Sequence, residues 1–249
     1  MTSLPGGAAD KAGNQYEHWW TALRITDVLE GRAARIRLEP LGEGGLGVEF
    51  EVDQEDITWA EQVKEASSGG AWTLKRLERQ GVLSAIKAQG LAGRAFRFVA
   101  STSAPQLADL SNRARKAEIF AEFTGVLTDA LTADLQNLSV TWDVTTEKAW
   151  TLLRRVHVAH HTVESMRTIA NTTFKLIFAD DADVVIAELR RFCDDHMHES
   201  LTAPKSGLTS NRRASGEGCW SATRVWSVAY IARSTDTGVE CPSRRHTSD

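Results

Sequence analysis

Two carboxylates, an amide and an ammonium group occur close together near residue 55 of this chain. Glu49 and Glu51 are two residues apart, and after a short polar segment so are Gln62 and Lys64. Side chains two residues apart on a strand point to the same face of a sheet. If the two faces match, these groups converge at one end of a small sheet. Carboxylate and carbonyl oxygens suit Mg²⁺ or Mn²⁺, and a nearby lysine can orient an attacking water and stabilise charge on a phosphate.

A β-hairpin is the element that has to position these groups. Polar and apolar residues alternate through residues 47–52 and again through residues 58–64, which is the pattern of half-buried strands. The polar residues 53–56 between them fit the connecting turn. We expect Lys64 to be exposed at the end of the second strand. The same alternation also fits a surface hairpin with a solvated charged face, and spacing alone leaves that alternative open.

These residues resemble the core motif of the PD-(D/E)xK nucleases, in which an acidic residue and a spacer precede (Asp/Glu/Gln)-x-Lys. The matching segment here is Glu61-Gln62-Val63-Lys64. Together with residues 7–17 and with Ala71-Trp72-Thr73-Leu74, it resembles the Cap4-type nuclease domain. Domains of that type stand at the N-terminus of bacterial anti-phage proteins, including large ATPase sensors. The resemblance extends over about residues 6–203.

The resemblance implies a role for each of four residues. Glu49 takes the position of the acidic metal ligand, Gln62 that of the second ligand, and Lys64 that of the catalytic lysine. Glu17, on the first helix, matches the extra acidic residue that many of these nucleases place beside the metal. Glu51 stays open as the alternative to Glu49. The chain departs from the family twice, because the first acid is commonly Asp and the second commonly Asp or Glu, whereas Gln62 is a neutral ligand that lowers metal affinity.

The function implied by the resemblance is a Mg²⁺- or Mn²⁺-dependent endodeoxyribonuclease that acts as the effector of a bacterial anti-phage defence system. Double-stranded DNA would be the substrate. A homo-oligomer and an ATPase or sensor module encoded downstream would be the partners. The alternative is a catalytically inactive DNA-binding or protein-interaction module that keeps the nuclease fold. The neutral Gln62 and the absence of a strong basic patch favour that alternative.

Charge and cysteine content narrow the setting in which the protein acts. The 249 residues carry 29 Lys and Arg against 33 Asp and Glu, a formal net charge of −4. DNA binding would therefore need a local basic patch, for which Lys75, Arg76, Arg79 and Lys87 are candidates. The 3 cysteines are far apart, which indicates neither a disulfide framework nor a zinc site. We expect a reducing cytoplasm, because the chain also lacks a membrane-spanning apolar run and a signal-peptide pattern.

Hydrophobic periodicity predicts an α/β fold with a mixed sheet flanked by helices and an appended helical subdomain. The resemblance implies that the sheet is restriction-endonuclease-like. A helix capped by Asp10 and stopped by Gly31 would carry Glu17. Strands are expected at residues 35–38, in the hairpin, at residues 94–100, and near residues 155–158. We divide the chain into a nuclease core at residues 1–116, a helical subdomain at residues 117–203 and a poorly ordered tail at residues 204–249.

Overall fold

The computed structural model of the chain describes residues 6–40, 45, 47–66, 69–178, 187–188, 191 and 200–202. The predicted tail at residues 204–249 lies outside the described residues, as do the three cysteines. No helix in the described ranges is both long and apolar enough to cross a membrane.

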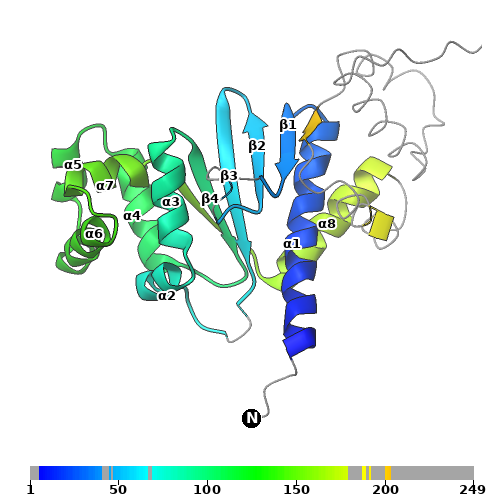
Figure 1. Ribbon diagram of the computed structural model, residues 1–249, viewed down its shortest axis with the longest axis horizontal. Helices are drawn as coiled ribbons and strands as arrows, with labels where there is room; N and C mark the ends of the chain where they lie inside the picture. Colours follow the sequence, from blue (N-terminus) through cyan, green and yellow to red (C-terminus); the bar gives the residue numbers. More distant parts are fainter. Residues whose placement is uncertain are drawn as a thin grey trace, which may run out of the picture.

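A mixed six-stranded sheet lies at the centre of the fold, with the strand order β5-β4-β3-β2-β1-β6 (Figure 1). Strands β3, β4 and β5 are parallel to one another, whereas β2 is antiparallel to β3 and β1 is antiparallel to both β2 and β6. The prediction of an α/β fold built on a mixed, helix-flanked sheet is confirmed. The strands are β1 (Arg35–Leu38), β2 (Phe50–Gln54), β3 (Ile57–Lys64), β4 (Ala95–Ala100), β5 (Val156–His160) and β6 (Ser200–Thr202).

Helices cover both faces of this sheet (Figure 1). Helices α1 (Gly6–Leu29) and α8 (Val163–Phe178) lie on one face, where their apolar side chains share a core with Val52 and Val99. The other face carries the remaining helices, which bury Phe96 and Phe98. They are α2 (Leu74–Arg79), α3 (Val82–Leu91), α4 (Pro105–Lys116), α5 (Phe120–Gly125), α6 (Asp129–Thr141) and α7 (Thr146–Leu153). Side chains on opposite faces of a strand therefore enter two separate cores.

The predicted hairpin forms, with a tighter turn than expected. Strand β2 continues through Gln54, so only two residues connect it to β3. Glu55 in this turn has a φ of 54°, in the left-handed region that lets a short turn reverse two strands. The register pairs Phe50 with Glu61 and Val52 with Trp59. This register decides which side chains of the two strands share a face.

The first helix starts earlier than predicted. It begins at Gly6, and Asp10 lies inside it instead of capping it. Alanines precede Asp10 in the chain, and alanine has the highest helix propensity, so the helix can extend past Asp10. The helix ends at Leu29, and Gly31 follows with a φ of 74°. Gly31 thus ends the helix as predicted.

The described residues within 117–203 form helices α5 to α8 and also contribute to the sheet. Strand β5 pairs with β4, which confirms the short strand expected near residues 155–158, and β6 pairs with β1. Helix α7 contacts α3 and α4, while α8 contacts α1. The boundary after residue 116 stays a prediction, and any such boundary has to allow for these contacts.

Candidate functional site

The register of the hairpin places three of the predicted site residues on one face. Glu49 precedes β2, and its N–H donates to the carbonyl of Glu61 at 3.0 Å. With Phe50 paired to Glu61, Glu49 lies opposite Gln62. Directly opposite residues in an antiparallel pair share a face, and Lys64 lies two residues beyond Gln62. Glu49, Gln62 and Lys64 therefore project to the same side of the sheet.

Those three residues line one cavity of about 360 Å³. Pro40, Gly45, Gly47 and Val48 form part of its wall. Glu39 also lines it, although no sequence pattern indicated this residue. Glu39 follows β1 with a φ of 40°, and its N–H donates to the carbonyl of Glu49 at 2.7 Å. The sequence shows only that a predicted strand ends before Pro40. It does not show that Glu39, at the end of this strand, lines the same cavity as Gln62 and Lys64.

An ion pair between Lys64 and Glu49 occupies this cavity. Lys64 Nζ lies 2.6 Å from Glu49 Oε1, and Glu49 Oε2 accepts from the backbone N–H of Val63 at 3.0 Å. Burial raises the pKa of Glu49, and the charge and hydrogen bond of Lys64 act against that increase. The expectation of an exposed Lys64 is wrong in degree, because its side chain is only 32% exposed and is paired. Truncating it leaves a largely buried carboxylate without its cation, at a cost of about 1–3 kcal/mol.

Gln62 supplies an unused oxygen in the same cavity. The residue is 3% exposed, and its Oε1 has no hydrogen-bond partner within the described part of the chain. Buried polar atoms almost always have a partner. Gly47 lies in the wall near this amide, at a position that favours glycine. A Cβ at residue 47 would lie 2.9 Å from Ala85 Cβ, and the backbone φ of Gly47 is 66°. Gln62 therefore contributes to the cavity lining an amide whose oxygen is buried and has no partner among the described residues.

Glu17 reaches the same group of charges from α1. Burial, and after it the charge of Glu49, raises the pKa of Glu17 to about 7, whereas Lys64 lowers it. Glu17 is not one of the residues that line the cavity. Two carboxylates that share a site repel each other, and this repulsion favours a proton or a cation between them. The structure thus brings Glu17 within electrostatic range of Glu49 and Lys64.

The donor groups fit a divalent cation of the Mg²⁺ type. The carboxylates of Glu49 and Glu17 and the unpartnered amide oxygen of Gln62 are hard oxygen donors, and Mg²⁺ commonly binds one or two carboxylates while keeping several waters. No group of three or more His, Cys, Asp and Glu side chains in the described ranges could hold a metal ion. The site would therefore depend on the Gln62 amide and on water to complete the coordination.

Glu51, the alternative acidic ligand, is committed elsewhere. It lies on the same face of β2 but further from the open end of the hairpin, and it is 4% exposed. Its carboxylate pairs with Arg94 at 2.8 Å and with Arg37 at 3.4 Å. Glu51 does not line the cavity that contains Lys64. The geometry thus favours Glu49 as the acidic group of the site.

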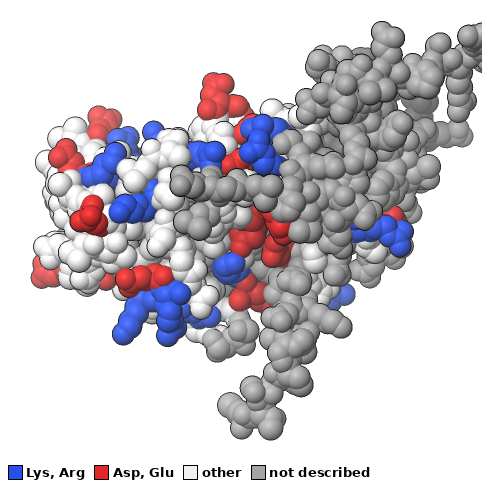
Figure 2. Space-filling view, in the orientation of Figure 1, with Lys and Arg blue, Asp and Glu red and all other residues white. Residues whose placement is uncertain are grey.

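Basic side chains gather over α2 (Figure 2). Lys75 and Arg79 are exposed, and the guanidinium of Arg76 lies 4.0 Å from the centre of the Trp72 ring. Helix α2 is the first helix after Lys64 at the end of β3. Lys87 is on α3 and is partly buried. The described part of the chain therefore has a local basic surface close in sequence to the candidate site.

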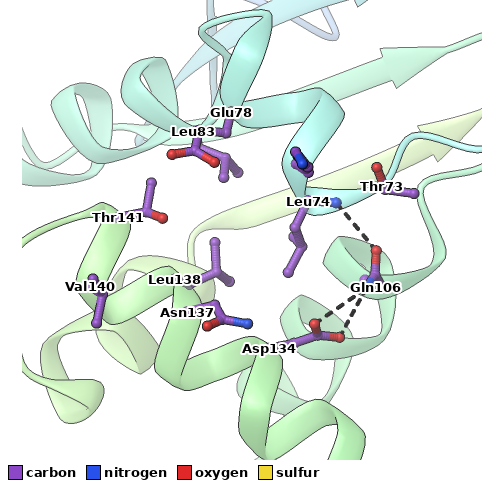
Figure 3. A pocket seen from close by; sticks show the side chains of 11 residues that line it. Thr73, Leu74, Glu78, Leu83, Gln106, Asp134, Asn137, Leu138, Val140 and Thr141 are labelled. Carbon is purple, nitrogen blue, oxygen red and sulfur yellow. Dashed lines mark hydrogen bonds between the residues drawn. The ribbon is translucent and has the colours of Figure 1, made fainter.

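A second cavity of about 470 Å³ lies among α2, α4 and α6, and no motif in the sequence pointed to it (Figure 3). Gln106 accepts a hydrogen bond from the Leu74 N–H at 3.2 Å and donates to the Asp134 carboxylate at 3.1 and 3.2 Å. None of Glu17, Glu49, Gln62 and Lys64 lines it. These bonds tie the start of α2 to α4 and α6 and so fix the helix that carries the basic surface.

No protein-family model and no curated protein matches this chain. Among solved structures, it is similar to an Acinetobacter baumannii Cap4 SAVED/CARF-domain containing receptor, at 9% identity and a TM-score of 0.45. The match to the receptor structure with the cyclic trinucleotide 2'3'3'-cAAA covers 82% of this chain and 43% of the receptor chain. With 3'3'3'-cAAA the shares are 81% and 46%, and in the structure described without a trinucleotide they are 81% and 45%.

The chain spans less than half the length of each of these receptor chains. These receptors share the name Cap4 with the family that the sequence resembles, but they are named as SAVED/CARF-domain receptors, two of them with a cyclic trinucleotide, and not as nucleases. At this identity and TM-score the likeness assigns no function to this chain. The nuclease assignment stays a prediction that depends on the sequence motif and on the cavity.

Proposed function

We propose that this protein is a divalent-metal-dependent DNA endonuclease whose catalytic centre is formed by Glu49, Gln62, Lys64 and Glu17. The observation that carries the proposal is the cavity that Glu49, Gln62 and Lys64 line together, with the buried Gln62 oxygen unpartnered in the described part of the chain. The PD-(D/E)xK-like spacing of these residues supports phosphodiester hydrolysis as the reaction. Neither observation alone distinguishes a nuclease from an ordinary charged hairpin, whereas the two together favour the nuclease.

Glu49, Gln62 and Glu17 are the residues that would hold Mg²⁺ or Mn²⁺. When bound, such a cation polarises the scissile phosphate and makes water more acidic. In the absence of a cation, Lys64 Nζ pairs with Glu49 Oε1 at 2.6 Å. A divalent cation in the cavity would compete with Lys64 for the Glu49 carboxylate. Lys64 would then be free to turn toward the substrate.

Lys64 has the reach and charge to act on the phosphate directly. Its ammonium offers three donors and no acceptor, so it can hold an attacking water and an oxygen of the phosphate at once. Negative charge builds up on the phosphate in the transition state, and a preorganised cation lowers the energy of that state more than it stabilises the ground state. Glu49 keeps the ammonium at the cavity until substrate arrives.

Double-stranded DNA is the proposed substrate, and the basic surface over α2 would contact its backbone. Lys75, Arg76 and Arg79 offer positive charge on a protein whose formal net charge is −4. Phosphate contacts of this kind position a duplex without reading its sequence. The DNA would then be held by α2 with a strand entering the cavity at the end of β3.

The resemblance to Cap4-type nuclease domains extends the proposal to a biological setting. The protein would act in the bacterial cytoplasm as the effector of an anti-phage defence system. It would work as a homo-oligomer under the control of an ATPase or sensor module encoded downstream. The second candidate function is a non-catalytic DNA-binding or protein-interaction module, which the neutral Gln62 in a position that is commonly acidic favours.

A plasmid assay separates the two candidates. Supercoiled plasmid is incubated with the protein in Mg²⁺, in Mn²⁺, in Ca²⁺ and in EDTA, and conversion to nicked and linear forms is followed over time. The nuclease proposal predicts conversion in Mg²⁺ or Mn²⁺ and none in EDTA. Folded protein that binds the plasmid but leaves it intact under every condition contradicts the proposal and supports the non-catalytic module. Cleavage that persists in EDTA contradicts the metal dependence.

A further inference from the structure

Two hydrogen bonds, from the residues before and after Glu17 at positions 16 and 20, attach α1 to strand β3 and to the segment that follows β5. Tyr16 Oη donates to the carbonyl of His161 at 2.7 Å, and Trp20 Nε1 donates to Glu61 Oε2 at 2.6 Å. Tyr16 is 1% exposed and Trp20 is 6% exposed. Residues four apart lie on the same face of a helix, so both bonds hold the face of α1 that is turned toward the sheet. Glu17 stands between the two points of attachment.

Glu61 is the fixed partner in the second of these bonds. It is fully buried and points away from its neighbour Gln62, since adjacent residues on a strand face opposite sides. Its other oxygen, Oε1, forms an ion pair with Arg97 on β4, and the Arg97 guanidinium lies 4.3 Å from the centre of the Trp59 ring. Both carboxylate oxygens therefore have a partner. A buried polar network that is satisfied in this way is rigid.

The two bonds also fix how far along the sheet α1 lies. Helix α1 runs opposite to β3, with the start of α1 and the end of β3 at the same end of the molecule (Figure 1). One turn back along α1 from Trp20 is therefore in the direction from Glu61 toward Lys64. At that level Tyr16 is bonded to His161, and the N–H of His161 donates to Ala100, the register partner of Lys64.

We propose that Glu61, together with Trp20 and Tyr16, positions Glu17 beside the Glu49–Lys64 pair. The inference deepens the proposed function and rests on it for its catalytic consequence, while its geometric content stands independently. Glu61 does not face the cavity, so it acts only through α1. Loss of either bond lets the helix shift along the sheet, and a shift of one residue rise, about 1.5 Å, is enough to take the Glu17 carboxylate out of place for a shared cation.

Trp20→Phe tests this inference with a matched control. The substitution removes the indole N–H and keeps an aromatic ring. Trp142→Phe removes the same kind of bond, because Trp142 is 1% exposed and its Nε1 donates to the Leu83 carbonyl at 2.8 Å. That bond lies in the helical layer on the opposite face of the sheet from α1. Both variants lose a buried indole N–H bond, which goes to a carboxylate in the case of Trp20 and to a backbone carbonyl in the case of Trp142. Only the Trp20 bond attaches α1.

The first measurement is binding of Mn²⁺ to the full chain without DNA, by electron paramagnetic resonance. Residues that support a metal ligand without touching the metal affect affinity by about 10- to 100-fold. We expect at least about tenfold weaker binding in Trp20→Phe and a change of less than about twofold in Trp142→Phe. In a Glu17→Gln background, Trp20→Phe should cause no further loss. An equal loss in both backgrounds would overturn the inference, because Trp20 would not be acting through Glu17.

The second measurement does not require metal or activity. Carbon-13 spectra of the glutamate side-chain carboxyl groups give the shift of Glu17. In the wild-type sequence, Glu49→Gln should displace that signal, because the two carboxylates interact. The displacement should shrink in Trp20→Phe and persist in Trp142→Phe. A displacement that is unchanged in Trp20→Phe would overturn the positioning role.

The two measurements also separate this inference from the proposed function. Wild-type protein that neither binds Mn²⁺ nor cleaves DNA would contradict the nuclease, while the carboxyl shifts would still decide whether α1 is held by Glu61. Tyr16→Phe is the second variant in case Trp20→Phe does not fold. It deletes one oxygen atom from the bond to His161 and should reduce the same displacement. Failure of both folded variants to do so would overturn the inference.

Discussion

Gln62 lies opposite Glu49 at the open end of the β2–β3 hairpin, and the two side chains differ in how their oxygens are used. Glu49 has one oxygen on Lys64 and the other on the Val63 N–H, whereas Gln62 Oε1 has no partner in the described part of the chain. A cation entering this cavity would take the Gln62 oxygen directly and would compete with Lys64 for Glu49. In the proposed nuclease, the relation between these two residues would set how tightly a metal binds.

Gln62→Glu should strengthen metal binding and weaken the metal-free fold. An additional charged ligand raises divalent-cation affinity, here by about tenfold, while an additional carboxylate opposite Glu49 adds repulsion in the absence of metal. Mn²⁺ titration and thermal melting with and without Mg²⁺ are the measurements. We expect a lower Tm in EDTA and a larger increase in Tm with Mg²⁺ than wild type shows. Unchanged Mn²⁺ affinity would mean that Gln62 is not a ligand.

The pH dependence of stability should reveal Glu17. Burial and the charge of Glu49 raise the pKa of Glu17 from 4.5 to about 7 in the folded protein. The protonated Glu17 carboxyl therefore makes its full contribution to stability below the unfolded pKa of 4.5, and this contribution is lost as the pH rises through about 7. Glu17→Gln, which stays neutral, should gain about 2 kcal/mol over wild type between pH 5 and pH 8. Chemical unfolding in EDTA at both pH values measures it.

Mg²⁺ provides the control for that pH effect. A cation bound beside Glu17 stabilises its charged form, so Mg²⁺ at pH 8 should narrow the gap between wild type and Glu17→Gln. Parallel stability profiles of the two proteins from pH 5 to pH 8 would show that Glu17 does not titrate with a raised pKa. In that case Glu17 would not belong to the charge cluster of Glu49 and Lys64.

Charge removal from α2 should weaken DNA binding without regard to sequence. Lys75→Ala and Arg79→Ala each remove one exposed cation from the basic surface. For each phosphate that a variant no longer neutralises, the slope of log affinity against log salt should decrease by about 1. Lys148→Ala, on the exposed side of α7, is the matched control. Fluorescence anisotropy of a labelled duplex in Ca²⁺ over a salt series is the measurement, and equal slopes in all variants would exclude α2 from the DNA interface.

Glu51 should matter for stability and not for metal binding. It is 4% exposed between Arg37 and Arg94, so Glu51→Gln should reduce the free energy of unfolding by about 1–3 kcal/mol through loss of its two ion pairs. Mn²⁺ affinity of the folded variant should equal that of wild type. Glu49→Gln is the comparison, and it should affect Mn²⁺ affinity more than the free energy of unfolding. Loss of Mn²⁺ binding in Glu51→Gln would return Glu51 to the role of acidic ligand.

The hairpin could be predicted from the sequence because strand alternation is a local property. It placed Gln62 and Lys64 on one face, and the register then brought Glu49 to that face. Glu61 was visible in the motif, but its function depends on α1 and β4 packing on the other side, which no local pattern encodes. The same is true of β5 and β6, whose places in the sheet depend on pairing with strands far away in the chain.

Glu39 shows the same limit at the cavity itself. Its N–H reaches the Glu49 carbonyl only because β1 pairs with β2, and the sequence between these strands does not indicate where Glu39 will lie. The opposite holds for Glu17, whose helix was predicted from periodicity and whose pKa is shifted by the charges of Glu49 and Lys64. Neither strand alternation nor packing assigns a catalytic role to a residue.

Lys64→Ala in a supercoiled-plasmid nicking time course is the most direct test of the nuclease centre. Reactions contain Mg²⁺ or Mn²⁺, and binding to the same plasmid is measured in Ca²⁺, with Lys148→Ala as the control. We expect Lys64→Ala to lose cleavage and keep most DNA binding, because the lysine charge acts on the transition state. Lys64→Arg should not restore it, since a planar guanidinium differs in shape and donor geometry from a compact ammonium. Cleavage by folded Lys64→Ala at the wild-type rate would contradict the assignment of Lys64 to the catalytic centre and, with it, the centre proposed from Glu49, Gln62 and Lys64.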